Sequence, residues 1–438
     1  MNALTAFFPA LSFRQVLGIL GLLLPLVSAG DDFIAGADVS HLDFFASRGV
    51  VYRDGGVSKD GLKILAGQGL NCVRLRLFTS SAVQAANDPY NSINNLDYTV
   101  PLAVRAKAAG LRWLLDFHYS DTWADPGHQS KPVAWTNLTL PQLEQRMYDY
   151  NSNTIAAFRA AGAIPDYVQP GNEITSGLLW PEGRVGGAYD NQWPQLGRLL
   201  NAAIRGIKDA AGANPPKIII HIDRGGDWNT TQWYFDHLTQ QQVEFDIIGE
   251  SYYPFWHGPL GALSHCLTNA AARYHKPVAV VETAFPWAFS TNLVGIPATP
   301  EGQVEYLAAL ARIVRGVPNS RGAGIVWWGA EYQNLAGYNL AGFENRSFFG
   351  SDGSVLPIAG AFGQLIVPVT IHAILKPEGV LLQWSLGGAG MSLTTATNLA
   401  QSGNWESASN SINYIHSHFE ASVPVDFGIS RFYRLEGE

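Results

Sequence analysis

Residues 166–173 read Asp166-Tyr167-Val168-Gln169-Pro170-Gly171-Asn172-Glu173, a short β-rich run that ends in a glutamate. A second run of the same form reads Pro277-Val278-Ala279-Val280-Val281-Glu282-Thr283. Both glutamates stand where a predicted strand gives way to a loop, at the C-terminal end of the strand. In a barrel of parallel strands, that end carries the active site. The two runs therefore predict a barrel enzyme with a pair of carboxylates at its mouth.

These two runs belong to a set of eight that alternate with segments of helical period. The eight runs are 33–39, 72–78, 112–118, 167–173, 217–223, 246–253, 277–282 and 324–328. The clearest helices between them are Leu143–Ala161, Gln192–Ala211 and Gln303–Arg315, where apolar residues recur at steps of three and four. Eight βα units over roughly 300 residues predict an α/β fold, a (β/α)8 TIM barrel.

An open, doubly wound sheet is the alternative architecture. Such a sheet usually carries a glycine-rich phosphate loop after its first strand. In this chain the first run is followed by Ser40-His41-Leu42-Asp43, which contains no glycine. The barrel is therefore favoured over the open sheet.

The two ends of the chain differ from the barrel in their composition. The N-terminal end has Arg14, then an apolar core from Val16 to Leu26, then small residues, which is the order of a secretory signal peptide. The C-terminal end has short strand-like runs separated by Gly, Ser and Asn, which predicts a small β-sandwich-like module. We expect a signal peptide at 1–29, a catalytic barrel at 30–362 and a β-rich module at 367–438. The protein would be secreted and extracellular, or periplasmic or at the cell surface.

The composition is that of a well-packed globular protein, with 47% hydrophobic and 15% charged residues. A net charge of −8 argues against nucleic acid or an anionic membrane surface as a partner. The only two cysteines, Cys72 and Cys266, exclude a disulfide framework. We expect two buried free thiols, with one bridge between them as the alternative. After signal cleavage we expect a monomer without membrane contact.

The paired glutamates suit the hydrolysis of a glycosidic bond. Retention of configuration requires two carboxyl groups about 5 Å apart, one to protonate the leaving oxygen and one to attack the sugar carbon. Glu173 and Glu282 come from the fourth and seventh predicted strands, on opposite sides of one barrel mouth. Asn172 precedes Glu173 and is expected to bond a sugar hydroxyl beside the reacting carbon. A solvated carboxylate or a helix cap is the alternative for a lone glutamate.

Two arginines alternate in the second predicted strand, Val73-Arg74-Leu75-Arg76-Leu77, so both point to one face. In a buried parallel strand this face is the barrel interior, where a guanidinium requires a carboxylate partner. We expect Arg76, nearer the C-terminal end, to pair with Glu282 and keep it ionised as a nucleophile. Structural ion pairs lower in the barrel are the alternative, more so for Arg74.

The loop after the third predicted strand is dense in polar and aromatic residues. His118 is a candidate to bond a substrate hydroxyl or to orient a catalytic carboxylate, with a buried structural histidine as the alternative. Asp121 and Trp123 are further candidates for sugar contact, as are Trp256 and Trp328, although a tryptophan is more often core. Several aromatic residues on one face favour an endo-acting enzyme on a polymer. No second cluster has metal-ligand spacing, so we expect no metal and no other cofactor.

Four motifs in order resemble the endo-β-1,4-galactanases of glycoside hydrolase family 53, also called arabinogalactan endo-β-1,4-galactanases. They are Asp116-Phe117-His118-Tyr119-Ser120-Asp121 with Trp123-Ala124-Asp125-Pro126 and Gln129, then Gly171-Asn172-Glu173-Ile174, then Ser251-Tyr252-Tyr253-Pro254-Phe255-Trp256-His257-Gly258, then Val281-Glu282-Thr283. The similarity runs from about Gly36 to Phe362. The C-terminal module lies outside it.

The resemblance implies Glu173 as acid/base, Glu282 as nucleophile, and β-1,4-galactan of type I arabinogalactan and pectin side chains as the substrate. It also implies that Asn172, Arg76, His118 and Tyr253 are neighbours in the site, and that Trp328 shapes the floor beside the cleaved bond. The chain departs from the family at Trp328-Gly329-Ala330-Glu331, where the family usually reads Trp-Glu-Pro. Some bacterial members bind calcium after the seventh strand, but Pro286 to Pro300 contains no carboxylate.

We therefore expect a secreted, retaining endo-β-1,4-galactanase that acts on a polysaccharide by double displacement. The alternatives are a retaining barrel endoglycanase on another β-linked polymer, mannan or glucan, and a non-catalytic carbohydrate-binding barrel.

Overall fold

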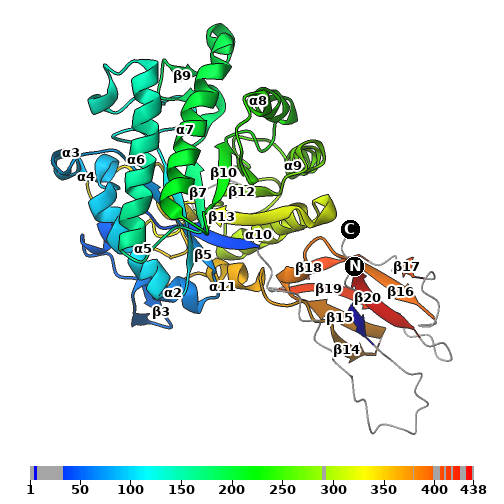
Figure 1. Cartoon of the computed structure of the whole chain (residues 1–438). Coiled ribbons are helices and arrows are strands. Elements are labelled where there is room, and N and C mark those ends of the chain that lie inside the picture. The colour runs from blue at the N-terminus through cyan, green and yellow to red at the C-terminus, as the bar shows by residue number, and fades with distance from the viewer. Residues whose placement is uncertain are drawn as a thin grey trace.

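Eight parallel strands close into a barrel in the computed structural model of the protein (Figure 1). In chain order they are β2 (Ile34–Asp38), β5 (Cys72–Leu77), β6 (Arg112–Phe117), β7 (Tyr167–Pro170), β10 (Lys217–Ile222), β11 (Ile247–Ser251), β12 (Val278–Thr283) and β13 (Gly322–Trp327). Strand β13 pairs with β2 and closes the ring. Each of the eight predicted runs forms one barrel strand, so the predicted TIM barrel is confirmed.

The structure describes residues 4–6, 33–288, 293–377, 379–397, 405–408, 411–415, 418–424 and 431–436. The predicted signal peptide, residues 1–29, lies outside the described residues except for β1 (Leu4–Ala6), which pairs with β20 (Phe432–Glu436) in antiparallel orientation. Within the described part of the chain, no helix combines the length and the apolar character that crossing a bilayer requires. Cys72 and Cys266 are buried free thiols, as predicted.

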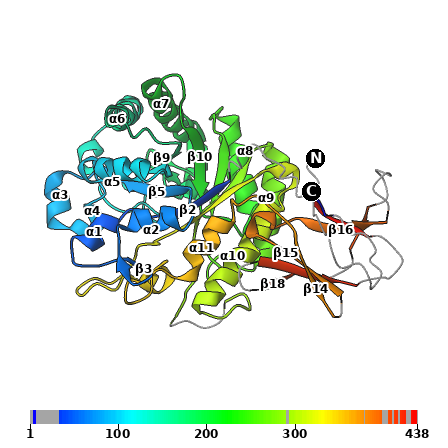
Figure 2. The same ribbon diagram turned by 90° about the horizontal axis from the view of Figure 1, so that it is seen from below.

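Helices surround the strands on the outside of the barrel, as the view from below shows (Figure 2). They are α1 (Leu42–Ala46), α2 (Gly61–Gly67), α3 (Ala82–Asn87), α4 (Pro89–Ser92), α5 (Leu96–Ala108), α6 (Leu140–Ala160), α7 (Trp193–Ala211), α8 (Trp228–Gln240), α9 (Leu260–Tyr274), α10 (Pro300–Arg315) and α11 (Pro357–Gln364). Short hairpins β3–β4 (Arg53–Asp54 and Val57–Ser58) and β8–β9 (Gly177–Leu178 and Gly183–Arg184) lie in the loops.

Helices α6 and α10 begin three residues before the starts expected from apolar periodicity. Capping explains both differences. The Thr139 N–H donates to Gln142 Oε1 at 2.9 Å, and the Gly302 N–H donates to Thr299 Oγ1 at 3.0 Å. These bonds satisfy backbone and side-chain groups in the first turn, before the apolar stripe begins.

The barrel interior consists of an apolar layer below a polar layer. The apolar layer contains Ile34, Cys72, Leu114, Tyr167, Ile219, Ile247, Ala279, Val281 and Val326. The polar layer lies two or four residues further along the strands and contains Asp38, Arg74, Asp116, Gln169, His221 and Ser251, all buried. Because side chains alternate across a strand, both sets point into the lumen. The polar layer is the one that faces the catalytic end of the barrel.

The C-terminal module forms two antiparallel sheets, in the orders β1-β20-β16-β17 and β14-β15-β19-β18, in which the edge strand β1 comes from the N-terminal end of the chain. Its other strands are β14 (His372–Lys376), β15 (Gly379–Trp384), β16 (Ser392–Ala396), β17 (Glu406–Ser407), β18 (Asn413–Ile415) and β19 (His418–Val423). Leu382 and Phe419 from one sheet and Leu393 and Leu435 from the other are buried, so each sheet has an apolar face. Helix α11 ends at Gln364 and β14 begins at His372.

Candidate active site

Glu173 and Glu282 line one cleft of about 620 Å³ at the catalytic end of the barrel. A carboxylate oxygen of one lies within 4.8 Å of a carboxylate oxygen of the other. Glu173 follows β7 with a left-handed backbone, φ 48°, which is strained for a residue with a side chain. Glu282 lies in β12 at a register shift against β11. Such a bulge re-aims a side chain, here into the cleft.

Arg74 binds Glu282 at the bottom of the cleft. Its Nη1 lies 3.0 Å from Glu282 Oε2 and 3.0 Å from Asp38 Oδ2. Its Nη2 lies 2.8 Å from Asp116 Oδ2 and donates to Asn172 Oδ1 at 2.7 Å. The remaining donor, Nε, donates to Gln169 Oε1 at 3.0 Å. The guanidinium therefore donates four hydrogen bonds, to Gln169, Asp38, Asp116 and Asn172, and forms an ion pair with Glu282.

The expected pairing of Arg76 with Glu282 is wrong. Arg76 Nη1 lies 3.1 Å from Asp38 Oδ1, and its Nη2 lies 2.9 Å from His41 Nδ1. Its guanidinium lies over the Trp123 ring, 4.3 Å from the centroid. Each carboxylate oxygen of Asp38 forms an ion pair with one of the two arginines. The guanidinium that contacts Glu282 is that of Arg74. Arg76 still lines the cleft, with an aromatic side chain above it.

Two contacts of Glu282 favour its charged form and oppose the effect of burial. Burial raises the pKa of Glu282 above its usual value, and the Arg74 guanidinium and the Tyr253 hydroxyl, which donates to Oε1 at 3.0 Å, oppose the rise. Burial and the negative Glu282 raise the pKa of Tyr253 well above its usual value, so this hydroxyl keeps its proton and remains a donor.

Among the described residues, no lysine or arginine forms an ion pair with Glu173. Burial and then the charge on Glu282 raise the pKa of Glu173 well above its usual value. Asp223, which also lines the cleft, adds to the rise. The stronger rise at Glu173 assigns the shared proton to Glu173 and the negative charge to Glu282. The two glutamates are thereby suited to the roles of acid and nucleophile.

A closed ring of hydrogen bonds fixes Glu173 in the cleft. The Glu173 N–H donates to His221 Nδ1 at 3.4 Å, His221 Nε2 lies 2.8 Å from Ser251 Oγ, and this hydroxyl donates to Glu173 Oε1 at 2.6 Å. The ring requires neutral His221 with its proton on Nε2, and burial lowers the pKa of His221 well below its usual value. The oxygens of both glutamates and a His221 nitrogen are close enough to hold a metal ion. Both His221 nitrogens, however, are already bonded within the ring.

Asn172 and His118 are fixed by neighbouring loop groups. Asn172 Nδ2 donates to the Ala124 carbonyl at 2.7 Å. The Ala124 N–H donates to His118 Nδ1 at 2.9 Å, so the His118 proton sits on Nε2, 3.0 Å from Asp116 Oδ2. Burial opposes the charge of Asp116, but Arg74 and His118 lower the pKa of that carboxyl to about 2. His118 therefore positions the loop and Asp116, although one edge of it also lines the cleft.

Asp121, which we expected to contact the sugar, is not among the residues that line the cleft. Its carboxylate accepts hydrogen bonds from Thr79 Oγ1 at 2.7 Å, Gln84 Nε2 at 3.0 Å and the Val133 N–H at 2.9 Å. These bonds connect the third-strand loop to the loop before it. Sequence proximity to His118 and Trp123 could not reveal these partners of the Asp121 carboxylate.

The three expected tryptophans do line the cleft. The Trp123 and Trp328 rings lie 6.2 Å apart. Trp256 lies next to Tyr253, 5.0 Å between ring centroids, and is 63% exposed. Exposed aromatic faces around paired carboxylates suit a ligand with apolar faces and polar edges, which is the character of a sugar.

The family assignment rests on the match to known proteins. The sequence model of Glycosyl hydrolase family 53 matches residues 34–362, most of the chain. The chain belongs to this family. It is a glycoside hydrolase, as the resemblance of its motifs implied.

Curated and solved relatives cover the same part of the chain. An arabinogalactan endo-β-1,4-galactanase of Thermothelomyces thermophilus is 36% identical over 75% of this chain and 98% of its own length. The glycoside hydrolase family 53 catalytic domain of Ignisphaera aggregans is 34% identical, with a TM-score of 0.70 over 77% of this chain and 98% of its own. A structure from a study of two fungal β-1,4-galactanases is 36% identical, with a TM-score of 0.67 over 75% of this chain and 98% of its own.

Sequence reasoning missed several residues of the family 53 site. His221 and Ser251 complete the ring around Glu173, and Asp38 bridges the two arginines. A signal existed for His221, because it is the one polar residue within Ile218-Ile219-Ile220-His221-Ile222. Glu331, where the chain departs from the family pattern, accepts the His41 N–H at 2.7 Å. Burial raises the pKa of Glu331 to about 8.

The substitution Ser251→Ala should move the alkaline limb of the pH profile of kcat/KM to higher pH. The hydroxyl donates to the Glu173 carboxylate, so its loss disfavours the charged form and raises the Glu173 pKa. A lost hydrogen bond of about 0.5–1.5 kcal/mol corresponds to a shift of roughly 0.4–1 pH unit. The profile is measured on a soluble chromogenic glycoside.

Thr231→Val is the matched control. Thr231 Oγ1 donates at 3.0 Å to the buried carboxylate of Glu250. Glu250 lies beside Ser251 in β11 but does not line the cleft. This variant should keep the parent profile. An alkaline limb that stays in place or moves to lower pH in Ser251→Ala would contradict the assignment of the proton to Glu173.

Proposed function

We propose that this protein is a retaining endo-β-1,4-galactanase that cleaves β-1,4-galactan, as in type I arabinogalactan and pectin side chains. The observation that carries the reaction type is the pair of carboxylates within 4.8 Å, one beside Arg74 and one without a cation. Retaining enzymes need about 5–5.5 Å between the two groups, whereas inverting enzymes leave more room for a water. The names of the family 53 relatives support galactan as the polymer.

The geometry supports the following sequence of steps. Glu173 protonates the oxygen of the leaving galactose while Glu282 attacks the anomeric carbon and forms a glycosyl-enzyme intermediate. Glu173, now a carboxylate, removes a proton from water, which attacks the same carbon and releases Glu282. Once the charge of Glu282 is used in the covalent bond, the pKa of Glu173 falls, as a base requires.

The residues around the two glutamates hold the nucleophile in place and offer contacts to the sugar. Arg74 and Tyr253 hold both oxygens of Glu282, which leaves the carboxylate fixed for attack. Asn172 uses its oxygen on Arg74 and one amide hydrogen on Ala124. Its second amide hydrogen is available for the sugar hydroxyl beside the reacting carbon. Trp123, Trp256 and Trp328 provide aromatic surface for several sugar units, which supports endo cleavage of a polymer.

Hydrolysis of purified polymers distinguishes the substrates. The full chain should release oligosaccharides from potato β-1,4-galactan at least tenfold faster than from β-mannan or β-glucan. The first reducing ends seen by proton NMR should be the β anomer, because two displacements retain configuration. Faster release from mannan or glucan would reject galactan as the substrate, and α anomers would reject retention.

The variant Glu282→Ala should lose hydrolysis and regain turnover of an activated galactoside when azide is added. Azide is small enough to enter the space left by the carboxylate and to attack the sugar in its place. The rate without azide should fall by several orders of magnitude, and the product with azide should be an α-galactosyl azide. A variant that stays inactive with azide, but melts at the parent temperature, would argue against Glu282 as nucleophile.

We also propose that the protein is exported and acts outside the cytoplasm. A polysaccharide is too large to reach a cytoplasmic enzyme, and residues 1–29 have the order of a signal peptide. N-terminal sequencing of the protein recovered from the medium or periplasm should start near Gly30. Full-length protein that stays in the cytoplasm would reject export.

A further inference from the structure

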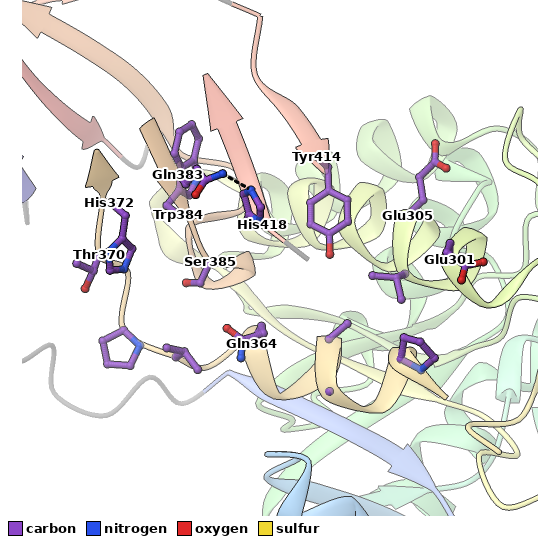
Figure 3. A pocket seen from close by; sticks show the side chains of 16 residues that line it. Glu301, Glu305, Gln364, Thr370, His372, Gln383, Trp384, Ser385, Tyr414 and His418 are labelled. Atoms are coloured by element: carbon purple, nitrogen blue, oxygen red, sulfur yellow. Dashed lines mark hydrogen bonds between the residues drawn. The ribbon is translucent and has the colours of Figure 1, made fainter. Parts of the chain in front are cut away.

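A second hollow lies on the flank of the barrel, between helices α10 and α11 and the C-terminal module (Figure 3). Its volume is about 1000 Å³, larger than the 620 Å³ of the active-site cleft, and the two hollows share no lining residue. We call it the flank groove and define it by Glu301, Glu305 and Gln364 on the barrel side and Gln383, Ser385, Tyr414 and His418 on the module side. No residue that the catalytic mechanism uses lines this groove.

The lining of the flank groove suits an uncharged ligand rich in hydroxyl groups. Among the described residues that line it, there is no lysine or arginine, while Glu301 and Glu305 contribute negative charge. An anionic ligand would meet no cation there. The other polar side chains are amides, hydroxyls and imidazoles, which both donate and accept. Prolines and valines from the two walls, such as Pro357 and Val367, add apolar surface for the faces of sugar rings.

The module side of the groove is built from neighbouring strands. Gln383 on β15 and His418 on β19 are bonded to each other at 2.7 Å between Nε2 atoms, as drawn in Figure 3. Gln383 Nε2 also lies 3.3 Å from Glu420 Oε2. These contacts fix the amide and the imidazole, so their remaining polar atoms have a defined direction before a ligand arrives.

Three buried polar atoms beside the groove have no partner among the described residues. They are the Tyr414 hydroxyl, the Ser385 hydroxyl and the Trp384 indole N–H. Each buried group without a hydrogen bond costs about 1–3 kcal/mol, and native proteins keep few of them. Figure 3 shows the Tyr414 side chain reaching from β18 toward α11, with its hydroxyl over the groove. A hydroxyl-rich ligand that lies between the two walls supplies a partner for the Tyr414 hydroxyl.

We propose that the flank groove binds an uncharged oligosaccharide segment of the polymer that the barrel cleaves. The identity of the segment as β-1,4-galactan rests on the proposed function, whereas the preference for a neutral sugar rests on the groove itself. A polymer held at the groove stays near the enzyme between cleavage events, which raises its effective concentration at the cleft. The module thereby contributes to substrate capture.

The test uses the full chain with Glu282→Ala as a background that cannot turn over the ligand. Calorimetric titration with a soluble β-1,4-galacto-oligosaccharide should show two sites. Tyr414→Phe, which removes only the hydroxyl, and Gln383→Ala should each weaken one site about 3- to 10-fold and leave the other unchanged. With Glu282 intact, the same variants should hydrolyse a short soluble galactoside within twofold of the parent.

Trp405→Ala is the matched control, because Trp405 packs on Arg434, 4.1 Å from ring centroid to guanidinium, and does not line the groove. It should bind like the parent at both sites. Groove variants that melt at the parent temperature and keep both sites unchanged would overturn the proposal, as would a single site in the parent. The titration can also show two sites for manno- or gluco-oligosaccharides, with Tyr414→Phe weakening one of them. That result would support sugar binding at the flank groove and would reject galactan as the polymer.

Discussion

The Arg74 guanidinium is the interaction on which the site depends. It donates hydrogen bonds to groups on β2, β6 and the end of β7 and forms an ion pair with Glu282 on β12, so one buried cation connects four parts of the barrel. Three of its acceptors are the buried carboxylates Asp38, Asp116 and Glu282. Loss of a buried charge partner typically costs about 3–5 kcal/mol, because the remaining charges are left unpaired. The polar layer of the barrel is therefore stable only as a complete network.

This network makes two chemically identical side chains different. Glu282 lies on Arg74 and receives the Tyr253 hydroxyl, so it carries the negative charge. Glu173 lies across the cleft without a cation, and the charge of Glu282 helps it to keep a proton. The ring through His221 and Ser251 fixes the position of Glu173 without neutralising it. An acid and a nucleophile thus arise from environment alone.

Much of the fold could be predicted from the sequence, because it depends on local patterns. Short apolar runs, helical periods and their alternation predicted all eight strands, and the two glutamates at strand ends lie in one cleft as expected. The tryptophans Trp123, Trp256 and Trp328 also line that cleft. The errors concern side-chain partners. Arg76 pairs with Asp38 instead of Glu282, and the Asp121 carboxylate binds groups of two loops, which its place in the sequence did not indicate.

The sequence by itself determined the barrel, its paired glutamates and the face on which the arginines lie, since strand periodicity fixes which side of a strand each residue occupies. Only the tertiary structure decided which arginine meets Glu282. The position of a residue along its strand determines the layer of the barrel in which its Cα lies. An arginine side chain is long enough to contact the next layer, however, and the register shift at Glu282 turns the carboxylate of that residue inward. The ring around Glu173 and the flank groove likewise exist only where residues distant in the chain come together.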